Sequence, residues 1–289
     1  MKKFIGTGVA VITPFKADFQ IDYNALSRII ANLLQNGIDY LVVLGSTAEA
    51  ATINPDEKKE LMAFFVRETQ GKVPLVLGLG GNNTRKVVDE IQQTDGAGFD
   101  AILSVVPSYN KPSQEGIYQH FKSISLASPL PVIVYNVPGR TGINMRPDTV
   151  LRLANDFNNI IGIKEAAGDM VQILELIKNK PDDFLVISGD DMLALPITLA
   201  GGAGVISVIA QALPKDFSSM IRLGLKGQVS EAFALQYQMM EAIDLIFEEG
   251  NPTGIKAMLY EQSFCDNVLR LPLVKASESL QNRIAHFIK

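Results

Sequence analysis

Lys164 is the residue with the most distinctive chemistry in this sequence. It follows the apolar run at residues 160–163, so its side chain is expected to start from a buried strand and to place its amine at the mouth of a sheet. Desolvation there lowers the pKa of a lysine from its usual value of about 10.4, and a neutral amine can attack a carbonyl carbon to form a Schiff base. The alternative is an ordinary rim lysine paired with the adjacent Glu165.

Tyr135 and Arg140 lie at the end of the preceding apolar run and on the loop that follows it. Because the ends of neighbouring barrel strands lie close together, Tyr135 is expected near Lys164. A tyrosine hydroxyl linked to Thr47 can give and take the protons that imine chemistry moves. The guanidinium of Arg140 can hold a carboxylate through two hydrogen bonds. A core tyrosine with a satisfied hydroxyl and a solvated loop arginine are the structural alternatives.

The composition argues against several other kinds of chemistry. The two histidines, His120 and His286, have no second candidate ligand nearby, so we expect no metal site. The single cysteine, Cys265, cannot form an internal disulfide and fits a reducing cytoplasm. The 26 basic and 31 acidic residues are interspersed and give a formal charge of -5, so neither nucleic acid nor an anionic membrane is an expected partner.

Two apolar stretches imitate membrane signals. Residues 4–12 follow two lysines, as in a signal peptide, but no small-residue cleavage site comes after them. Residues 192–213 carry no charge, yet Pro196 and the glycines at positions 201, 202 and 204 divide them into a short helix, a turn and a strand. The first stretch is therefore predicted to be a strand and the second to be buried barrel core.

Eight short apolar runs must position the reactive side chains. None shows the polar alternation of a half-exposed strand, so helices are expected to cover both faces of a parallel sheet. Eight such units close more naturally into a (β/α)8 TIM barrel than they form an open sheet, and we predict a catalytic barrel over residues 1–213. The predicted strands are residues 8–12, 40–44, 74–78, 101–105, 132–135, 160–163, 185–188 and 204–207.

Helices are predicted from their ends and from their periodicity. Asp22 and Asn54 are residue types that begin helices, and each precedes an amphipathic segment. No strand pattern appears in residues 214–289, where helical patterns predict a C-terminal helical extension that packs on the barrel or makes an interface. The helical patterns in this part are residues 215–226, 229–248, 253–262 and 276–288.

Four segments carry a family resemblance. They are residues 6–15 (GTGVAVITPF), 45–49 (GSTAE), 135–142 (YNVPGRTG) and 162–165 (GIKE). Together they resemble the dihydrodipicolinate synthase and N-acetylneuraminate lyase family of pyruvate-dependent class I aldolases. The resemblance spans nearly the whole chain and favours the Schiff-base role of Lys164 over the rim-lysine alternative.

The resemblance implies roles for four further residues in the reaction of pyruvate. Lys164 would form the Schiff base, so no separate cofactor is expected. Ser46 and Thr47 would bind the pyruvate carboxylate, Tyr135 would be the acid and base, and Thr47 its relay. Tyr109 would reach that relay from a neighbouring subunit, which implies at least a dimer and, by the resemblance, a tetramer.

The resemblance also implies a second substrate. Arg140, in the form GRTG, matches synthases whose arginine binds the carboxylate of aspartate semialdehyde. Gly189, Asp190 and Ile206 match positions that line the pocket for this substrate. The implied product is 4-hydroxy-tetrahydrodipicolinate, on the diaminopimelate route to lysine.

The chain departs from the usual family pattern at several positions. Ser46 replaces a threonine and keeps a hydroxyl, and Ala48 replaces a glycine, which suggests that this turn does not need a positive φ. In lysine-inhibited relatives an allosteric site at the dimer interface has histidine and acidic ligands. Here the matching positions, Pro55, Lys58, Lys86 and Ser108, include two added cations that would repel a lysine ammonium, so weak or absent lysine feedback is expected.

Two alternative functions stay open at this point. A sugar-acid lyase, acting on N-acetylneuraminate or a 2-keto-3-deoxy acid, would share the same lysine, tyrosine and pyruvate chemistry and differ only in the second substrate. A catalytically silent barrel that binds a small acid would have no need for an intact lysine, tyrosine, threonine and arginine set.

Overall fold

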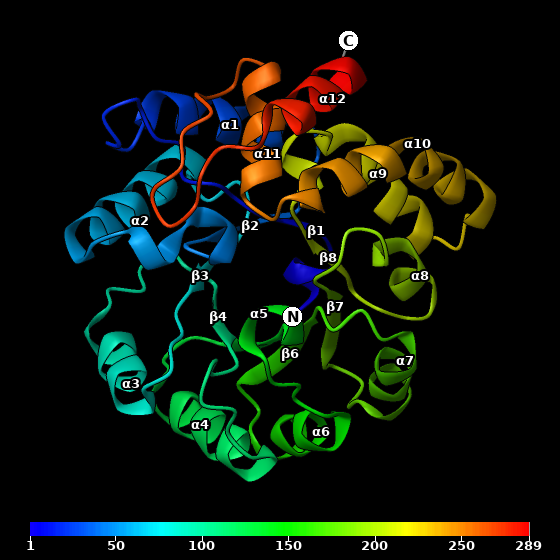
Figure 1. The fold of residues 1–289 in the computed structure, drawn as a ribbon. Coiled ribbons are helices and arrows are strands. Elements are labelled where there is room, and N and C mark those ends of the chain that lie inside the picture. Colours follow the sequence, from blue (N-terminus) through cyan, green and yellow to red (C-terminus); the bar gives the residue numbers. More distant parts are fainter. Residues whose placement is uncertain (289) are drawn as a thin grey trace.

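Eight parallel strands close into a barrel in the computed structural model, which describes residues 1–288 (Figure 1). The strands follow one another around the barrel in chain order, and β8 pairs with β1 to close it. The predicted (β/α)8 fold is therefore confirmed. The strands are β1 (Gly6–Ala10), β2 (Tyr40–Val43), β3 (Leu75–Gly78), β4 (Ala101–Val105), β5 (Val132–Asn136), β6 (Ile160–Glu165), β7 (Leu185–Ser188) and β8 (Gly204–Ser207).

Five predicted strands are wrong by one or two residues. Strand β2 ends one residue earlier than predicted and β3 begins one residue later. Strand β1 lies two residues earlier than predicted, while β5 and β6 continue through Asn136 and Glu165. The longer ends form because the register pairs Tyr135 with Lys164 and Asn136 with Glu165. Lys164 thus lies within a strand, not just after one.

Helices surround the barrel in a ring (Figure 1). The predicted starts are confirmed, since the side chain of Asp22 accepts a hydrogen bond from Ala25 N and Asn54 forms a capping box with Glu57. The ring contains α1 (Tyr23–Gln35), α2 (Pro55–Thr69), α3 (Thr84–Gln93), α4 (Gln114–Ala127), α6 (Pro147–Asp156), α7 (Met170–Asn179), α8 (Ala194–Leu199) and α9 (Pro214–Leu225). A one-turn helix, α5 (Pro138–Thr141), follows β5.

Three C-terminal helices pack on one side of the ring. They are α10 (Val229–Glu248), α11 (Thr253–Glu261) and α12 (Glu278–Ile288), and they lie beside α1 and α9 (Figure 1). Helix α9 packs on β1 and β8, between the last and first strands of the barrel. The predicted helical C-terminal segment is confirmed, whereas the boundary between residues 1–213 and 214–289 stays a prediction.

The segment without charges, residues 192–213, is part of the barrel core. It forms α8, a turn and β8, as predicted, and the strand is fully buried. Among the described helices, none has the length and apolar character needed to span a membrane.

Close approach at the barrel seam explains one of its glycines. Gly204 has a φ of +113°, and a Cβ there would lie 2.0 Å from the carbonyl oxygen of Gly6 on the paired strand. Only glycine fits this backbone conformation and spacing. The two glycines therefore allow β8 to close onto β1.

Candidate active site

A cavity of about 1190 Å³ opens at the carboxyl ends of the strands. This is the end at which barrel enzymes carry their active sites. Most of the predicted site residues line the cavity, although they come from five separate strands, helices and loops. They are Ser46, Thr47, Tyr135, Arg140, Lys164, Gly189 and Asp190.

The amine of Lys164 is buried against the ring of Tyr135. Its side chain is 5% exposed, and Nζ lies 4.5 Å from the centroid of that ring. The pKa of Lys164 is lowered to about 8, mainly by burial; the carboxylate of Asp191 opposes this shift, and the charge of Arg140 adds to it. Near neutral pH, an appreciable fraction of this amine is therefore uncharged and able to act as a nucleophile.

Tyr135 keeps its proton in this environment. Burial raises the pKa of its hydroxyl to about 12, while the nearby positive charge of Arg140 acts in the opposite direction. Glu165 raises the same pKa through its charge. The site thus joins a partly neutral amine with a neutral phenol that can donate a proton.

Glu165 does not pair with Lys164, so the rim-lysine alternative is wrong. Successive residues of a strand point to opposite faces, and Glu165 points away from the barrel interior. Its carboxylate accepts hydrogen bonds from Asn136 Nδ2, Gln172 Nε2 and Ala167 N. Lys164 is left facing the cavity.

The loop after β2 carries Ser46 and Thr47 in a single turn of 3-10 helix, Ser46–Ala48. Thr13 Oγ1 donates to Ala48 O at 2.8 Å and ties this turn to the end of β1. Ala48 has a helical conformation, as its replacement of glycine suggests, and the left-handed residue is Glu49, with φ 56°. Thr47 is buried, whereas Ser46 is exposed to the cavity mouth.

Arg140 lies on α5 at the cavity mouth. Its side chain is exposed, and Nη2 donates to the carbonyl oxygen of Asn251 at 3.0 Å. The remaining guanidinium N–H groups stay available to a bound carboxylate. Its charge acts on both Lys164 and Tyr135.

The loop after β7 provides Gly189 and Asp190. A Cβ on Gly189 would lie 3.0 Å from Lys164 Cε and 2.6 Å from Ala166 Cβ, so the glycine leaves room for the lysine side chain. Asp190 Oδ1 accepts from the backbone N–H groups of residues 192 and 193. Asp190 therefore shapes the loop as well as lining the cavity.

Two predicted site residues do not line the cavity. Tyr109 is 86% exposed on the loop after β4, and its backbone N–H donates to Thr141 O. Ile206 is 1% exposed and packs inside the barrel. Tyr109 therefore does not contribute to the cavity of its own chain, and it could take part only in the site of a second copy.

The structure brings two further residues into the site beyond the predicted catalytic and substrate-binding residues. Asp191 is buried and lines the cavity, and its carboxylate accepts hydrogen bonds from Val208 N and Ile209 N. Burial raises its pKa to about 6. Asn251 also lines the cavity, where its Nδ2 donates to Thr47 Oγ1 at 2.9 Å. Asp191 follows a predicted strand end, but no sequence signal marks Asn251.

A family comparison decides among the barrel enzymes that such a cavity allows. The model of the dihydrodipicolinate synthetase family matches residues 3–289. The chain belongs to this family. The predicted resemblance and the predicted enzyme class, a lyase of the dihydrodipicolinate synthetase family, are confirmed.

Individual relatives of the dihydrodipicolinate synthetase family resemble the whole chain. The 4-hydroxy-tetrahydrodipicolinate synthase of Flavobacterium psychrophilum is 59% identical over 100% of this chain and 99% of the relative. The solved dihydrodipicolinate synthase of Thermotoga maritima is 38% identical, with a TM-score of 0.96 over 99% of this chain and 98% of that one. The chloride-inhibited enzyme of Acinetobacter baumannii in complex with pyruvate is 35% identical, with the same TM-score and the same coverage of each chain.

Proposed function

We propose that this protein is a Schiff-base aldolase that condenses pyruvate with L-aspartate 4-semialdehyde to give 4-hydroxy-tetrahydrodipicolinate, on the diaminopimelate route to lysine. The observation that carries the proposal is the buried Lys164 amine, with its pKa lowered to about 8 and the Tyr135 ring beside it. The names of the relatives above support the same reaction.

The first half of the proposed reaction activates pyruvate. Neutral Lys164 Nζ attacks the keto carbon, and loss of water leaves a protonated imine. This imine accepts the electron pair of a methyl C–H bond when the proton leaves, which gives an enamine. The Tyr135 hydroxyl, in exchange with Thr47, donates the proton to the departing water and takes protons back in later steps.

The second half joins the two substrates. The enamine carbon attacks the aldehyde carbon, whose oxygen takes a proton, and the amine of the aspartate semialdehyde then displaces Lys164 from the imine carbon as the ring closes. Arg140, exposed at the cavity mouth, holds the carboxylate of the semialdehyde. Ser46 and Thr47 hold the carboxylate of pyruvate, and Gly189 and Asp190 bound the second-substrate pocket. No cofactor other than the covalent imine takes part.

A shared site between subunits is part of the proposal. The exposed side chain of Tyr109 would complete the relay of a second copy, in a dimer that pairs again into a tetramer in the cytoplasm. Activity measured during dilution, alongside the mass of the particle, tests this. A fully active monomer at nanomolar concentration would overturn the shared site.

Two experiments test the chemistry. Borohydride reduction in the presence of pyruvate should add one pyruvate-derived group to the peptide that contains Lys164, and mass spectrometry should lose that adduct in Lys164→Met. A coupled assay then offers aspartate semialdehyde against N-acetylneuraminate and 2-keto-3-deoxy acids. Turnover of a sugar acid alone would replace the proposed second substrate, and no adduct at all would favour a barrel that only binds acids.

A further inference from the structure

Asn251 contacts two of the proposed site residues at once. It precedes α11, in the C-terminal part of the chain, and its side chain is 8% exposed where it lines the cavity. Its side-chain Nδ2 donates to Thr47 Oγ1 at 2.9 Å, and its main-chain oxygen accepts from Arg140 Nη2 at 3.0 Å. The two contacts use different atoms, so a side-chain substitution removes only the first.

A buried ion pair holds Asn251 against the loop that carries Thr47. Lys256, on the first turns of α11, lies 2.5 Å from Glu49 on that loop, and both side chains are fully buried. Lys256 Nζ also donates to Val268 O at 2.8 Å. Because Glu49 follows Thr47 by two residues and Lys256 follows Asn251 by five, the same two segments are joined twice.

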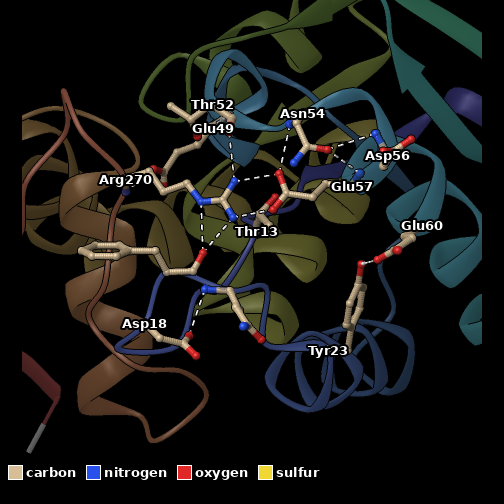
Figure 2. Close-up of polar contacts among 12 residues, drawn as sticks. Thr13, Asp18, Tyr23, Glu49, Thr52, Asn54, Asp56, Glu57, Glu60 and Arg270 are labelled. Atoms are coloured by element: carbon tan, nitrogen blue, oxygen red, sulfur yellow. Dashed lines mark hydrogen bonds and ion pairs between the residues drawn. The ribbon is translucent and has the colours of Figure 1, made fainter.

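The segment that follows α11 adds a third connection (Figure 2). Arg270 N donates to Glu49 Oε2 at 2.9 Å. In Figure 2 its guanidinium points toward Glu57 and the carbonyl oxygen of Thr52, with Nη1 at 2.9 Å from each. The loop that carries Thr47 and the C-terminal segment are therefore joined at three places, and these contacts together hold Asn251 against Thr47.

The direction of the hydrogen bond matters because a threonine hydroxyl has only one proton. Since Asn251 Nδ2 donates to Thr47 Oγ1, the Thr47 proton must point to a different acceptor. Asn251 Oδ1 is buried without a hydrogen-bond partner among residues 1–288, an unfavourable state for a residue that served stability alone. An amide also keeps its protons at every pH of interest, so the direction does not change during turnover.

We propose that Asn251 is a positioning residue that aims the Thr47 proton into the cavity, toward the acid and base chemistry at Tyr135 and Lys164. The proposal rests on the proposed function, because it assigns Thr47 the relay of that reaction. Asn251 itself need not touch the substrate. Its effect passes through one hydroxyl group.

Replacing Asn251 with aspartate or with leucine tests the direction of the bond. Asn251→Asp keeps the shape but presents a carboxylate that can only accept, so Thr47 turns its proton away from the cavity. Asn251→Leu removes both donor and acceptor and leaves the hydroxyl free to rotate. We expect kcat to fall by about 100-fold in Asn251→Asp and by about 10-fold in Asn251→Leu. KM for aspartate semialdehyde should stay within about twofold, because the main-chain contact to Arg140, which holds that substrate, is retained.

The pH dependence of kcat distinguishes a reversed hydrogen bond to Thr47 from general damage to the structure. A carboxyl group in this buried position has a raised pKa, and its protonated form can donate to Thr47 as the amide does. The ratio of kcat in Asn251→Asp to kcat in the unmodified protein should therefore rise by about tenfold as the pH falls from about 9 to about 6. A constant ratio, or a larger loss in Asn251→Leu than in Asn251→Asp, would overturn the proposal.

A double substitution tests whether the effect passes through Thr47. In the background Thr47→Val, the further change Asn251→Asp should leave kcat unchanged within about twofold, since no hydroxyl remains to be aimed. Independent, multiplying losses would contradict the proposal. Asn267→Asp is the matched control, because Asn267 lies in the same C-terminal part, also has an unpartnered Oδ1, and does not line the cavity. It should keep full kcat.

Borohydride trapping and turnover of the unmodified protein distinguish a failure of the proposed function from a failure of the role of Asn251. If borohydride traps no pyruvate on Lys164 of the unmodified protein, the proposed function fails. If the unmodified protein is trapped and turns over, and kcat of the folded Asn251 variants is unchanged, only the role of Asn251 fails. If Asn251→Asp does not fold, Asn251→Leu tests the proposal in its place, because an unchanged kcat in that variant also overturns the proposal.

Discussion

The amine of Lys164 and the ring of Tyr135 face each other across paired strands, with Nζ 4.5 Å from the ring centroid. The register of β5 and β6 places the two residues side by side, so they point to the same face of the sheet. Burial removes the amine from water and lowers its pKa, while the face of the ring offers a charged amine some compensation. This balance leaves the lysine titrating near physiological pH.

The pH dependence of pyruvate activation should report Lys164. Schiff-base formation needs the neutral amine, whose pKa is about 8. The value of kcat/KM for pyruvate should therefore rise about tenfold per pH unit below about pH 8 and level off above it. Initial rates between about pH 6 and about pH 10 measure this limb. A limb that continues to rise beyond about pH 10 would show an unperturbed lysine.

Lys164→Met should make the protein inactive and more stable. Burial lowers the pKa of Lys164 from 10.5 to about 8, and each pKa unit corresponds to about 1.4 kcal/mol, so the buried ammonium costs about 3 kcal/mol at neutral pH. The cost is complete below about pH 8 and fades as the pH rises toward 10.5, because the unfolded chain then binds more protons than the folded one. Thermal unfolding at several pH values should show the gain shrinking across that window.

Arg140→Met should weaken the binding of aspartate semialdehyde. Loss of a charged, two-pronged hydrogen bond to a carboxylate costs about 2 to 3 kcal/mol, so KM for aspartate semialdehyde should rise by about 30- to 150-fold. Arg140 also lowers the pKa of Lys164. Its removal should therefore move the rise of kcat/KM for pyruvate to higher pH. Steady-state kinetics with each substrate varied in turn provide both values. An unchanged KM for the semialdehyde would remove Arg140 from its proposed role.

The buried pair of Lys256 and Glu49 should be costly to break on one side. Lys256→Met leaves the Glu49 carboxylate buried without its cation, which should lower the free energy of unfolding by about 3 to 5 kcal/mol. Adding Glu49→Gln removes the stranded charge and should restore more than half of that loss. Denaturant unfolding of the two variants and the parent measures the difference. If the double variant is less stable than Lys256→Met, the loss does not come from an unpaired charge.

Lysine should inhibit this protein weakly or not at all. Lys86 is exposed, and Lys58 is held in an ion pair with Glu90 at 2.9 Å, where the resemblance places a lysine-binding site in regulated relatives. Glu90 is thus already paired with Lys58, and the charge of Lys86 would repel an incoming ammonium group. Activity measured against increasing lysine tests this expectation. Inhibition at submillimolar lysine would contradict it.

The amino-acid sequence by itself determined the barrel and its reactive pair. Strands that are buried on both faces must be continuous apolar runs, so eight of them could be located from composition and order alone. Lys164 and Tyr135 end two consecutive runs, and in a parallel barrel consecutive strands are neighbours. Their meeting therefore followed from local pattern and topology.

Only the tertiary structure decided how the site is completed. Asn251 lies 204 positions from Thr47, Lys256 lies 207 positions from Glu49, and no local periodicity links residues so far apart. Glu165 points away from Lys164 because β6 continues beyond the apolar run, where it pairs with β5. The end of β6 is therefore set by this pairing and not by the apolar pattern. Such contacts depend on how folded segments pack against one another, and that packing leaves no regular spacing in the chain.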